Sequence, residues 1–136
     1  MSAFKAYDIR GVWGKDFNED TVYKIGYFLP ELLNTDHVIV GRDVRASSPT
    51  IHDRLIEGIT DRGADVLDLG LSTTPMVYWA TTHLNADASV QITASHNPAE
   101  YNGLKISRTG ALPVGGDSGL KDLEKMVNEK QVVPVE

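Results

Sequence analysis

The chain has 136 residues, no cysteine and a formal net charge of -6, with 41% hydrophobic and 24% charged residues. This length suffices for one domain with its own core, and the composition excludes a chain that is disordered throughout. The absence of cysteine excludes disulfides and thiol catalysis, and the negative charge disfavours nucleic acids and acidic membranes as partners. Residues 1–10 hold no signal peptide and no run reaches the ~20 apolar residues of a membrane span, so we expect a soluble cytoplasmic protein.

The first third of the chain predicts a strand, a helix and a second strand. Residues 4–9 fit a short strand, and Asn18 or Asp20 is a suitable N-cap for the helix that follows. Pro30 falls inside that helical pattern, so we expect a kink or an early end there. Residues 37–40 then form an apolar, β-branched run, which is typical of a buried strand.

The middle of the chain continues the alternation of helices and strands. Ser47-Ser48-Pro49 is typical of a helix start, and Gly63 is expected to end that helix. Residues 65–69 predict another strand, which Gly70 closes, and Thr73-Thr74-Pro75 opens a third helix.

The last third predicts two more strands and a final helix over residues 120–127. The link between strands 88–93 and 104–107 is too short for a crossover helix, so we expect that pair to be antiparallel. The whole pattern predicts an α/β fold, namely a three-layer sandwich in which helices flank a mixed, mostly parallel sheet. We expect a single domain over residues 1–136.

Ser95 and His96 follow the buried strand directly, and Asn97-Pro98 is a turn signal. Chemistry in α/β proteins is usually placed at such strand ends. Three sets of cationic side chains, Arg10, Arg42 with Arg45, and Lys105, also follow or begin apolar runs, so some of them are expected to converge on Ser95. Arginine suits phosphate oxygens, and this pattern indicates phosphate chemistry.

Each of these residues also has a purely structural interpretation. Ser95 would serve only in a turn, and Lys105 would be a solvated charge at a strand edge. Arg42 and Asp43 would form an ion pair beside Arg45. Trp13 and Trp79 are interpreted as packing residues rather than stacking platforms.

Several short motifs together make the chain similar to a known family. In the order of the chain they are Lys5-Ala6-Tyr7-Asp8-Ile9-Arg10-Gly11, Gly41-Arg42-Asp43-x-Arg45-x-Ser47, Thr93-Ala94-Ser95-His96-Asn97-Pro98, Tyr101-Asn102-Gly103-x-Lys105, and the glycine-rich stretch 110–120. On these motifs the chain resembles the first domain of the α-D-phosphohexomutases, and within them the phosphomannomutase/phosphoglucomutase enzymes. The remaining three domains of that family have no counterpart in this chain.

The resemblance implies a role for each matching residue. Ser95 would be the phosphoserine that transfers a phosphoryl group between O1 and O6 of a hexose phosphate through a sugar bisphosphate, which is an isomerase reaction. Lys105 would move a proton and stabilise charge, and Arg10 would hold the phosphoserine oxygens. His96 and Asn97 would shape the loop and contact the substrate. A Mg²⁺ ion would be bound by the phosphoserine oxygen of Ser95.

The resemblance covers one domain of four, so we expect this chain alone to have negligible mutase activity. It would need the remaining domains of the enzyme as partners around a mannose or glucose phosphate. The alternative is a stand-alone, non-enzymatic module that binds an anion, a sugar phosphate or a protein partner and retains the loop. An exposed apolar face would favour the first reading, and a polar face would favour the second. A serine hydrolase is a weaker alternative, because the chain has no Gly-x-Ser-x-Gly elbow.

Overall fold

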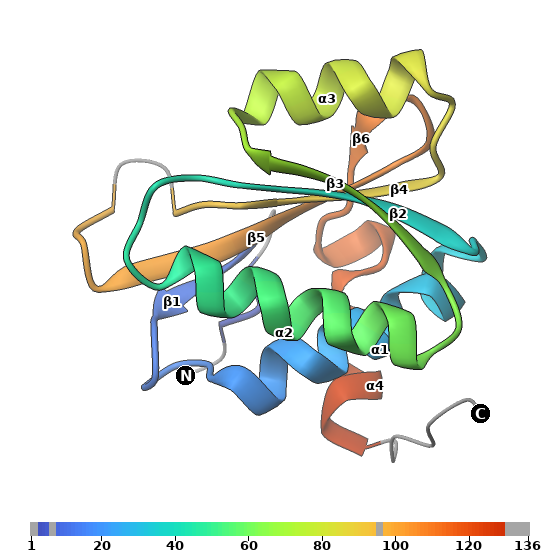
Figure 1. The fold of residues 1–136 in the computed structure, drawn as a ribbon. Helices are drawn as coiled ribbons and strands as arrows, with labels where there is room; N and C mark the ends of the chain where they lie inside the picture. Colours follow the sequence, from blue (N-terminus) through green and yellow to red (C-terminus); the bar gives the residue numbers. More distant parts are fainter. Residues whose placement is uncertain (1–2, 6–7, 95–96, 130–136) are drawn as a thin grey trace.

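The structure is a computed structural model that describes residues 3–5, 8–94 and 97–129. It contains a six-stranded sheet in the order β1-β5-β4-β2-β3, with β6 paired to β5 (Figure 1). The strands are β1 (Ile9–Val12), β2 (His37–Arg42), β3 (Asp65–Leu71), β4 (Ala88–Ile92), β5 (Tyr101–Arg108) and β6 (Leu112–Pro113). The helices are α1 (Glu19–Leu33), α2 (Ser48–Asp61), α3 (Thr74–His83) and α4 (Leu120–Glu129), with short 3₁₀ turns at Thr109–Ala111 and Gly116–Ser118.

The strand directions confirm the predicted mixed sheet. Strands β1 and β4 both pair with β5 in antiparallel fashion, while β2 is parallel to both β4 and β3. The expected antiparallel pairing of the two strands around the central loop is therefore present. Because β1, β2, β3 and β4 all run in the same direction, their carboxyl ends meet at one edge of the sheet.

Helices cover both faces of the sheet, as the three-layer prediction requires. Helices α1 and α2 pack on one face with α4 beside α1, and α3 lies on the opposite face (Figure 1). The main core fills the space between the sheet and the first helix layer, and its fully buried side chains include Ile9, Ile25, Leu29, Ile51, Leu55, Ile92 and Leu104. This layer makes the carboxyl edge of the sheet a rigid base for the loops that follow it.

Helices α1 and α2 approach one another through two glycines. A Cβ atom added at Gly26 would lie 2.3 Å from the carbonyl oxygen of Leu55, and one added at Gly58 would lie 2.1 Å from that of Tyr23. Real Cβ atoms do not approach backbone so closely, so the crossing of the two helices depends on the absence of side chains at both positions.

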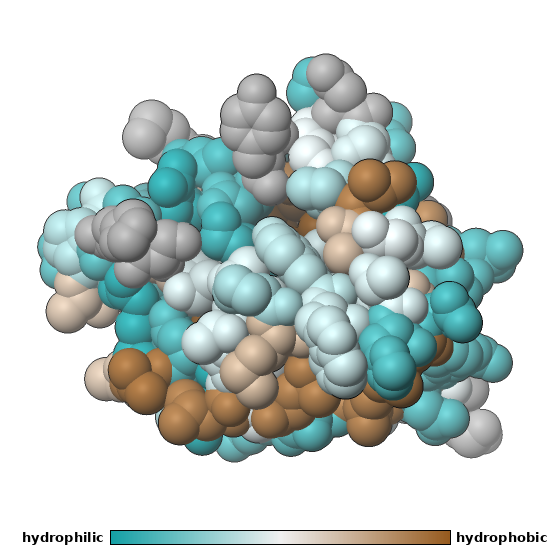
Figure 2. Space-filling view, turned by 90° about the horizontal axis from the view of Figure 1, so that it is seen from above, coloured by the Kyte–Doolittle hydropathy of each residue, from teal (hydrophilic) through white to brown (hydrophobic). Residues whose placement is uncertain are grey.

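The opposite face of the sheet is covered less completely. Leu69 packs with Ile39, Ala80 and Ala86 under α3, but Leu67, which pairs with Ile39 and shares its side of the sheet, is 47% exposed. Met76 and Trp79 on α3 are 51% and 65% exposed. Figure 2 views the molecule from this side, with apolar surface gathered along the lower margin. We call Leu67, Met76 and Trp79 the α3 apolar face.

The two tryptophans differ in their surroundings. Trp13 packs against the main core and makes an edge-to-face contact with Phe17, with ring centroids 5.2 Å apart. The packing prediction is therefore correct for Trp13 and wrong for Trp79, which stacks on His83 at the surface with ring centroids 4.5 Å apart. A short helix over an edge strand cannot bury every large side chain that it carries.

The N-terminal strand begins later than predicted. Strand β1 starts at Ile9, where Phe4 bridges Ile9 and Arg10 N–H donates to the Ala3 carbonyl at 2.8 Å. Pairing with β5 therefore selects Ile9–Val12 as the strand, rather than the apolar pattern of residues 4–9.

Of the predicted kink or early end at Pro30, the early end is wrong, because α1 continues to Leu33. Pro30 lies in the last turn and is buried, so its missing N–H leaves only one helical hydrogen bond unmade while its ring adds apolar contact. Asn34, in the left-handed conformation at φ 51°, ends the helix instead. Likewise β3 continues through Gly70 to Leu71. None of the described helices is long and apolar enough to cross a membrane.

Candidate active site

Arg10 lies at the carboxyl edge of the sheet, one strand away from the end of β4. It is paired in register with Gly103 of β5, and the Gly103 carbonyl accepts a hydrogen bond from Thr93 N–H at 2.9 Å. The backbones are close here, since a Cβ at Gly103 would lie 2.2 Å from the Ile9 carbonyl oxygen. Glycine at position 103 therefore lets β1, which bears Arg10, lie close to β5, and β5 in turn pairs with β4.

Arg10 also reaches the loop that follows β4. Its Nη1 donates to Asn97 Oδ1 at 3.3 Å, and Asn97 N–H donates to the Ala94 carbonyl at 3.1 Å. The predicted residues Ser95 and His96 lie outside the described residues, so their predicted roles stay predictions. The flanking residues Ala94 and Asn97 are held together, and Asn97 contacts Arg10.

Lys105 lies on the side of the sheet that faces α3. It pairs in register with Gln91 of β4, and its Nζ is 3.8 Å from Asp8 Oδ2. The Lys105 side chain is 30% exposed and that of Asp8 is 13% exposed, so the amine is half-buried beside a carboxylate at the start of β1. An ammonium held in this way can donate a hydrogen bond or a proton to the oxygens of an anionic group.

The residues after β2 separate into two groups. Arg45 donates to main-chain carbonyls of the loop after β4, at Asn97 and Pro98, each at 2.8 Å. The Arg42 side chain instead donates from its Nη1 to the Asp43 carbonyl at 3.2 Å. The Arg42 charge also lowers the pKa of Asp68 on β3. The sequence leaves open whether Arg42 or Arg45 reaches the loop; the structure brings Arg45 there and directs Arg42 elsewhere.

The ion pair at this point also differs from the predicted one. Asp43 pairs with Arg45, through Nε and Oδ2 at 3.4 Å, and not with Arg42. Asp68, near Arg42, binds the imidazole of His52 at 2.8 Å and accepts from Gly70 N–H at 2.8 Å. Partial burial raises the pKa of Asp68, but these two hydrogen bonds and the charges of His52 and Arg42 outweigh it, and the net pKa lies below the usual range.

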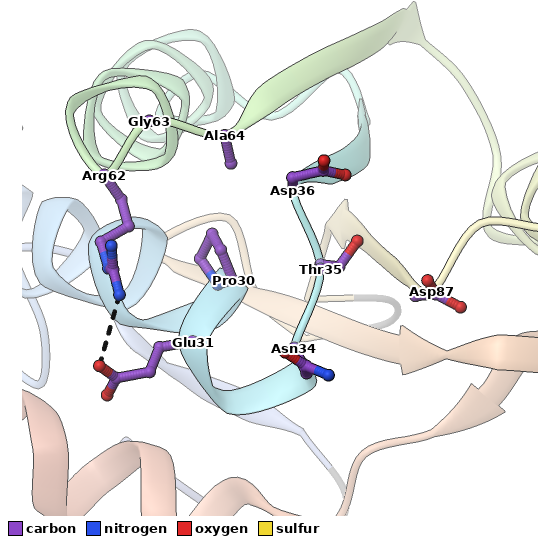
Figure 3. Close-up of a pocket in the computed structure, with 9 residues that line it drawn as sticks. All are labelled: Pro30, Glu31, Asn34, Thr35, Asp36, Arg62, Gly63, Ala64 and Asp87. Carbon is purple, nitrogen blue, oxygen red and sulfur yellow. Dashed lines mark hydrogen bonds and ion pairs between the residues drawn. The ribbon is translucent and has the colours of Figure 1, made fainter.

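A pocket at the other end of the sheet does not fit this chemistry. It has a volume of about 540 Å³ and is bordered by residues that precede the parallel strands, including Asp36, Ala64 and Asp87 (Figure 3). Its arginine, Arg62, is 3.5 Å from Glu31, as the dashed line in Figure 3 marks. Three carboxylates and one paired arginine would repel a phosphate rather than bind it.

The described residues also do not form a metal-binding cluster. No group of three or more histidine, aspartate or glutamate side chains that could hold a metal ion occurs in residues 3–5, 8–94 and 97–129. These residues alone therefore do not fit a complete Mg²⁺ site, and any ligand set would have to include groups beyond them.

The sequence and the fold agree with a known family. Residues 1–132 match the profile described as "Phosphoglucomutase/phosphomannomutase, alpha/beta/alpha domain I". The chain belongs to the phosphoglucomutase/phosphomannomutase domain I family. A phosphomannomutase from Escherichia coli is 46% identical over 136 residues, which are 100% of this chain and 30% of that protein. A phosphomannomutase from Klebsiella pneumoniae is also 46% identical over 136 residues, which are 87% of that protein.

A solved structure supports the same assignment. The crystal structure of a phosphoglucomutase/phosphomannomutase family protein from Burkholderia thailandensis superposes with a TM-score of 0.86 and 32% sequence identity. The match covers 97% of this chain and 31% of that one. This domain I chain thus spans about a third of the length of most relatives that it matches.

Sequence reasoning missed two features of the domain I site. It did not predict that Asp8 lies beside Lys105, and it did not predict what Arg45 binds. The Gly41-Arg42-Asp43-x-Arg45 spacing was a signal that this segment matters, but main-chain carbonyls on a distant loop leave no residue pattern that could identify them as its partners.

Proposed function

We propose that this chain is the phosphoserine-bearing domain of a phosphomannomutase/phosphoglucomutase. In the proposal, Ser95 accepts a phosphoryl group from a hexose bisphosphate and returns it to the other end of a hexose monophosphate. The observation that carries the proposal is the Arg10–Asn97 hydrogen bond at 3.3 Å, because it brings a guanidinium to the residue two positions after Ser95. Membership of the family and the names of its relatives support the same reaction class.

The cationic groups around the loop suit phosphoryl transfer. That reaction needs positioning and neutralisation of spread negative charge more than it needs covalent chemistry from the protein. In the proposal, Arg10 binds equatorial phosphoryl oxygens, Lys105 exchanges a proton with the attacking or leaving oxygen, and His96 and Asn97 contact the sugar phosphate. The Asp8 carboxylate, 3.8 Å from Nζ, holds the amine at the start of β1.

Magnesium enters the proposal at one point only. A phosphoryl oxygen on Ser95 would supply one ligand to Mg²⁺, which would neutralise charge on the group in transfer. Because the described residues hold no further ligand cluster, we derive no step through the metal from this chain. The other ligands would come from parts of a longer enzyme.

The α3 apolar face supports the interpretation as one domain of a larger protein. Three large side chains, Leu67, Met76 and Trp79, are 47%, 51% and 65% exposed on one side of the molecule. Such a face is typical of a surface that another part of a protein covers. A stand-alone module with a polar face is the second candidate, and the exposed Trp79 counts against it. In the proposal, the isolated chain has negligible mutase turnover because the walls that exclude water from the phosphoserine are missing.

The experiment that tests the proposal is intact-mass analysis with peptide mapping. The chain is incubated with glucose 1,6-bisphosphate and Mg²⁺, and S95A is treated in parallel. We expect the mass of one phosphoryl group on Ser95 and none in S95A, with negligible turnover of mannose 1-phosphate in a coupled assay. A chain that binds the bisphosphate but never gains a phosphoryl group would support the binding module and overturn the proposal.

A further inference from the structure

Arg45 is bonded to the loop after β4 at three main-chain positions. Its Nη2 donates to the Asn97 carbonyl at 2.8 Å, and its Nη1 donates to the carbonyls of Pro98 at 2.8 Å and Tyr101 at 3.0 Å. The side chain is only 14% exposed. A guanidinium with several fixed donors can hold three carbonyls at once, which a lysine ammonium cannot do in one plane.

Arg45 is itself fixed by Asp43. The carboxylate accepts from Arg45 N–H at 3.0 Å and lies 3.4 Å from Nε, and it also accepts from Ser48 Oγ at 2.6 Å. Asp43 N–H in turn donates to the carbonyl of Ile92, the last residue of β4, at 3.0 Å. Asp43 therefore links Arg45, which binds the residues after Ser95, to the end of β4, which precedes Ser95.

A second buried contact supports the same geometry. Asn102, which is fully buried, donates through Nδ2 to Ser47 Oγ at 2.8 Å and Ser48 Oγ at 3.0 Å. It follows Tyr101, whose carbonyl Arg45 holds. The end of the loop is thus joined to the start of α2 by side chains as well as by the Arg45 bonds.

We infer that Arg45 is a positioning residue that fixes the loop for phosphoryl transfer at Ser95; this inference rests on the proposed function. Asp43 and Arg45 connect Ile92, three residues before Ser95, with Asn97, two residues after it. Arg45 is the positive group towards which the three carbonyl oxygens point. Without its guanidinium, these oxygens could instead point at an anionic phosphoryl group and repel it. Arg45 acts through the backbone and needs no contact with the substrate.

The first test measures amide hydrogen exchange in R45M. This variant removes every donor and retains a side chain of similar length. We expect the amides of Asn97 and Tyr101, which donate to the Ala94 and Pro98 carbonyls, to exchange roughly tenfold faster, while amides in α1 and α4 stay unchanged. The matched control is R54M, since Arg54 is an arginine of α2 that pairs with Glu57 away from the loop. Unchanged loop exchange, or an equal rise throughout the chain, would overturn the inference.

The second test is rescue of the loop. In R45A, millimolar methylguanidinium is expected to restore slow exchange of Asn97 and Tyr101, because the free cation can occupy the vacated position beside Asp43. The R45K variant retains the charge but lacks the planar fork, so we expect it to recover less than half of the lost protection. Full recovery in R45K would mean that only charge matters, and this would contradict the assigned role.

The third test separates this inference from the proposed function. The rate of phosphorylation of Ser95 by glucose 1,6-bisphosphate is compared in wild type, R45M and R54M, and we expect a fall of roughly a hundredfold in R45M alone. If wild type is phosphorylated and R45M reacts equally fast, the positioning role fails and the proposed function stands. If wild type is never phosphorylated, the proposed function fails, whatever the exchange data show for the loop.

Discussion

Arg10 on β1 and Asn97 on the loop after β4 are 87 positions apart in the chain and are joined by a hydrogen bond of 3.3 Å. Between their strands lies β5, which is antiparallel to both. The contact therefore depends on the mixed sheet. Because β5 is antiparallel to both neighbours, the carboxyl ends of β1 and β4 point the same way. The long Arg10 side chain then reaches past β5 to the loop after β4.

This relationship predicts the effect of R10M on anion binding. A hydrogen bond to a charged group contributes about 1.5–3 kcal/mol, so we expect mannose 1-phosphate to bind roughly 10- to 100-fold more weakly. Titration followed by chemical shifts of the loop amides measures the affinity. R62M is the matched control, because Arg62 lies in the pocket at the opposite end of the sheet. Equal affinities for R10M and wild type would exclude Arg10 from the phosphate site.

Removal of the Lys105 amine separates catalysis from stability. In K105M we expect the phosphorylation of Ser95 to slow by roughly 10²- to 10⁴-fold, the usual contribution of a proton-transfer group. The free energy of unfolding should change by less than about 1 kcal/mol, because a partly exposed ion pair at 3.8 Å contributes little. Intact-mass time courses and urea unfolding give the two quantities. A loss of several kcal/mol would indicate that Lys105 is mainly structural.

Tyr23 predicts how stability changes at alkaline pH. Burial, together with a hydrogen bond of 2.5 Å from its hydroxyl to Asp61, raises the pKa of Tyr23 to about 12, above an ordinary value of 10.0. The folded state thus holds this proton more tightly than the unfolded state. The stability that this contributes is complete below pH 10 and is lost as the pH rises towards 12.

The Y23F variant tests this pH dependence. At neutral pH it should be about 1 kcal/mol less stable than wild type, the usual value of one hydrogen bond. The difference should shrink between pH 10 and 12, where wild type loses its contribution and Y23F does not. Urea unfolding at several pH values measures both curves, and D61N, which removes the acceptor charge, should behave similarly. A difference that is constant with pH would contradict the assignment.

The glycines at the α1–α2 crossing predict an unusual response to alanine. In an ordinary helix, a change from glycine to alanine stabilises by about 1 kcal/mol. At Gly26 and Gly58 the new methyl group would meet backbone carbonyls at 2.3 Å and 2.1 Å, so we expect each variant to be destabilised by about 1–3 kcal/mol. Thr60→Ala, at an exposed position of α2, is the control and should change stability by less than about 0.5 kcal/mol. If Gly26→Ala were stabilising, the helices would have to be further apart than described.

The order of strands and helices could be predicted largely from the sequence, because alternating apolar runs and helix caps are local signals. The antiparallel pairing of β4 and β5 followed from the length of their link. The start of β1 could not be predicted, since its pairing with β5 decides which residues extend. The course of α1 past Pro30 depends on the packing of one buried ring, which no local pattern reports.

The candidate site was predictable where side chains meet side chains. Arg10 and Asn97 belong to motifs, and the structure brings them together. The role of Arg45 was not predictable in the same way, because its acceptors are carbonyls that every residue possesses. Sequence spacing also could not distinguish Arg42 from Arg45, although alternation along β2 directs Arg42 to Asp68.

The two tryptophans provide an optical reporter of assembly. Trp13 is packed against the main core, whereas Trp79 is 65% exposed. In a W13F background, emission would come from a single indole in contact with water. Any polypeptide that covers the α3 apolar face would shift the emission of Trp79 to shorter wavelength. Fluorescence can therefore report the binding of a polypeptide to this face without an added label.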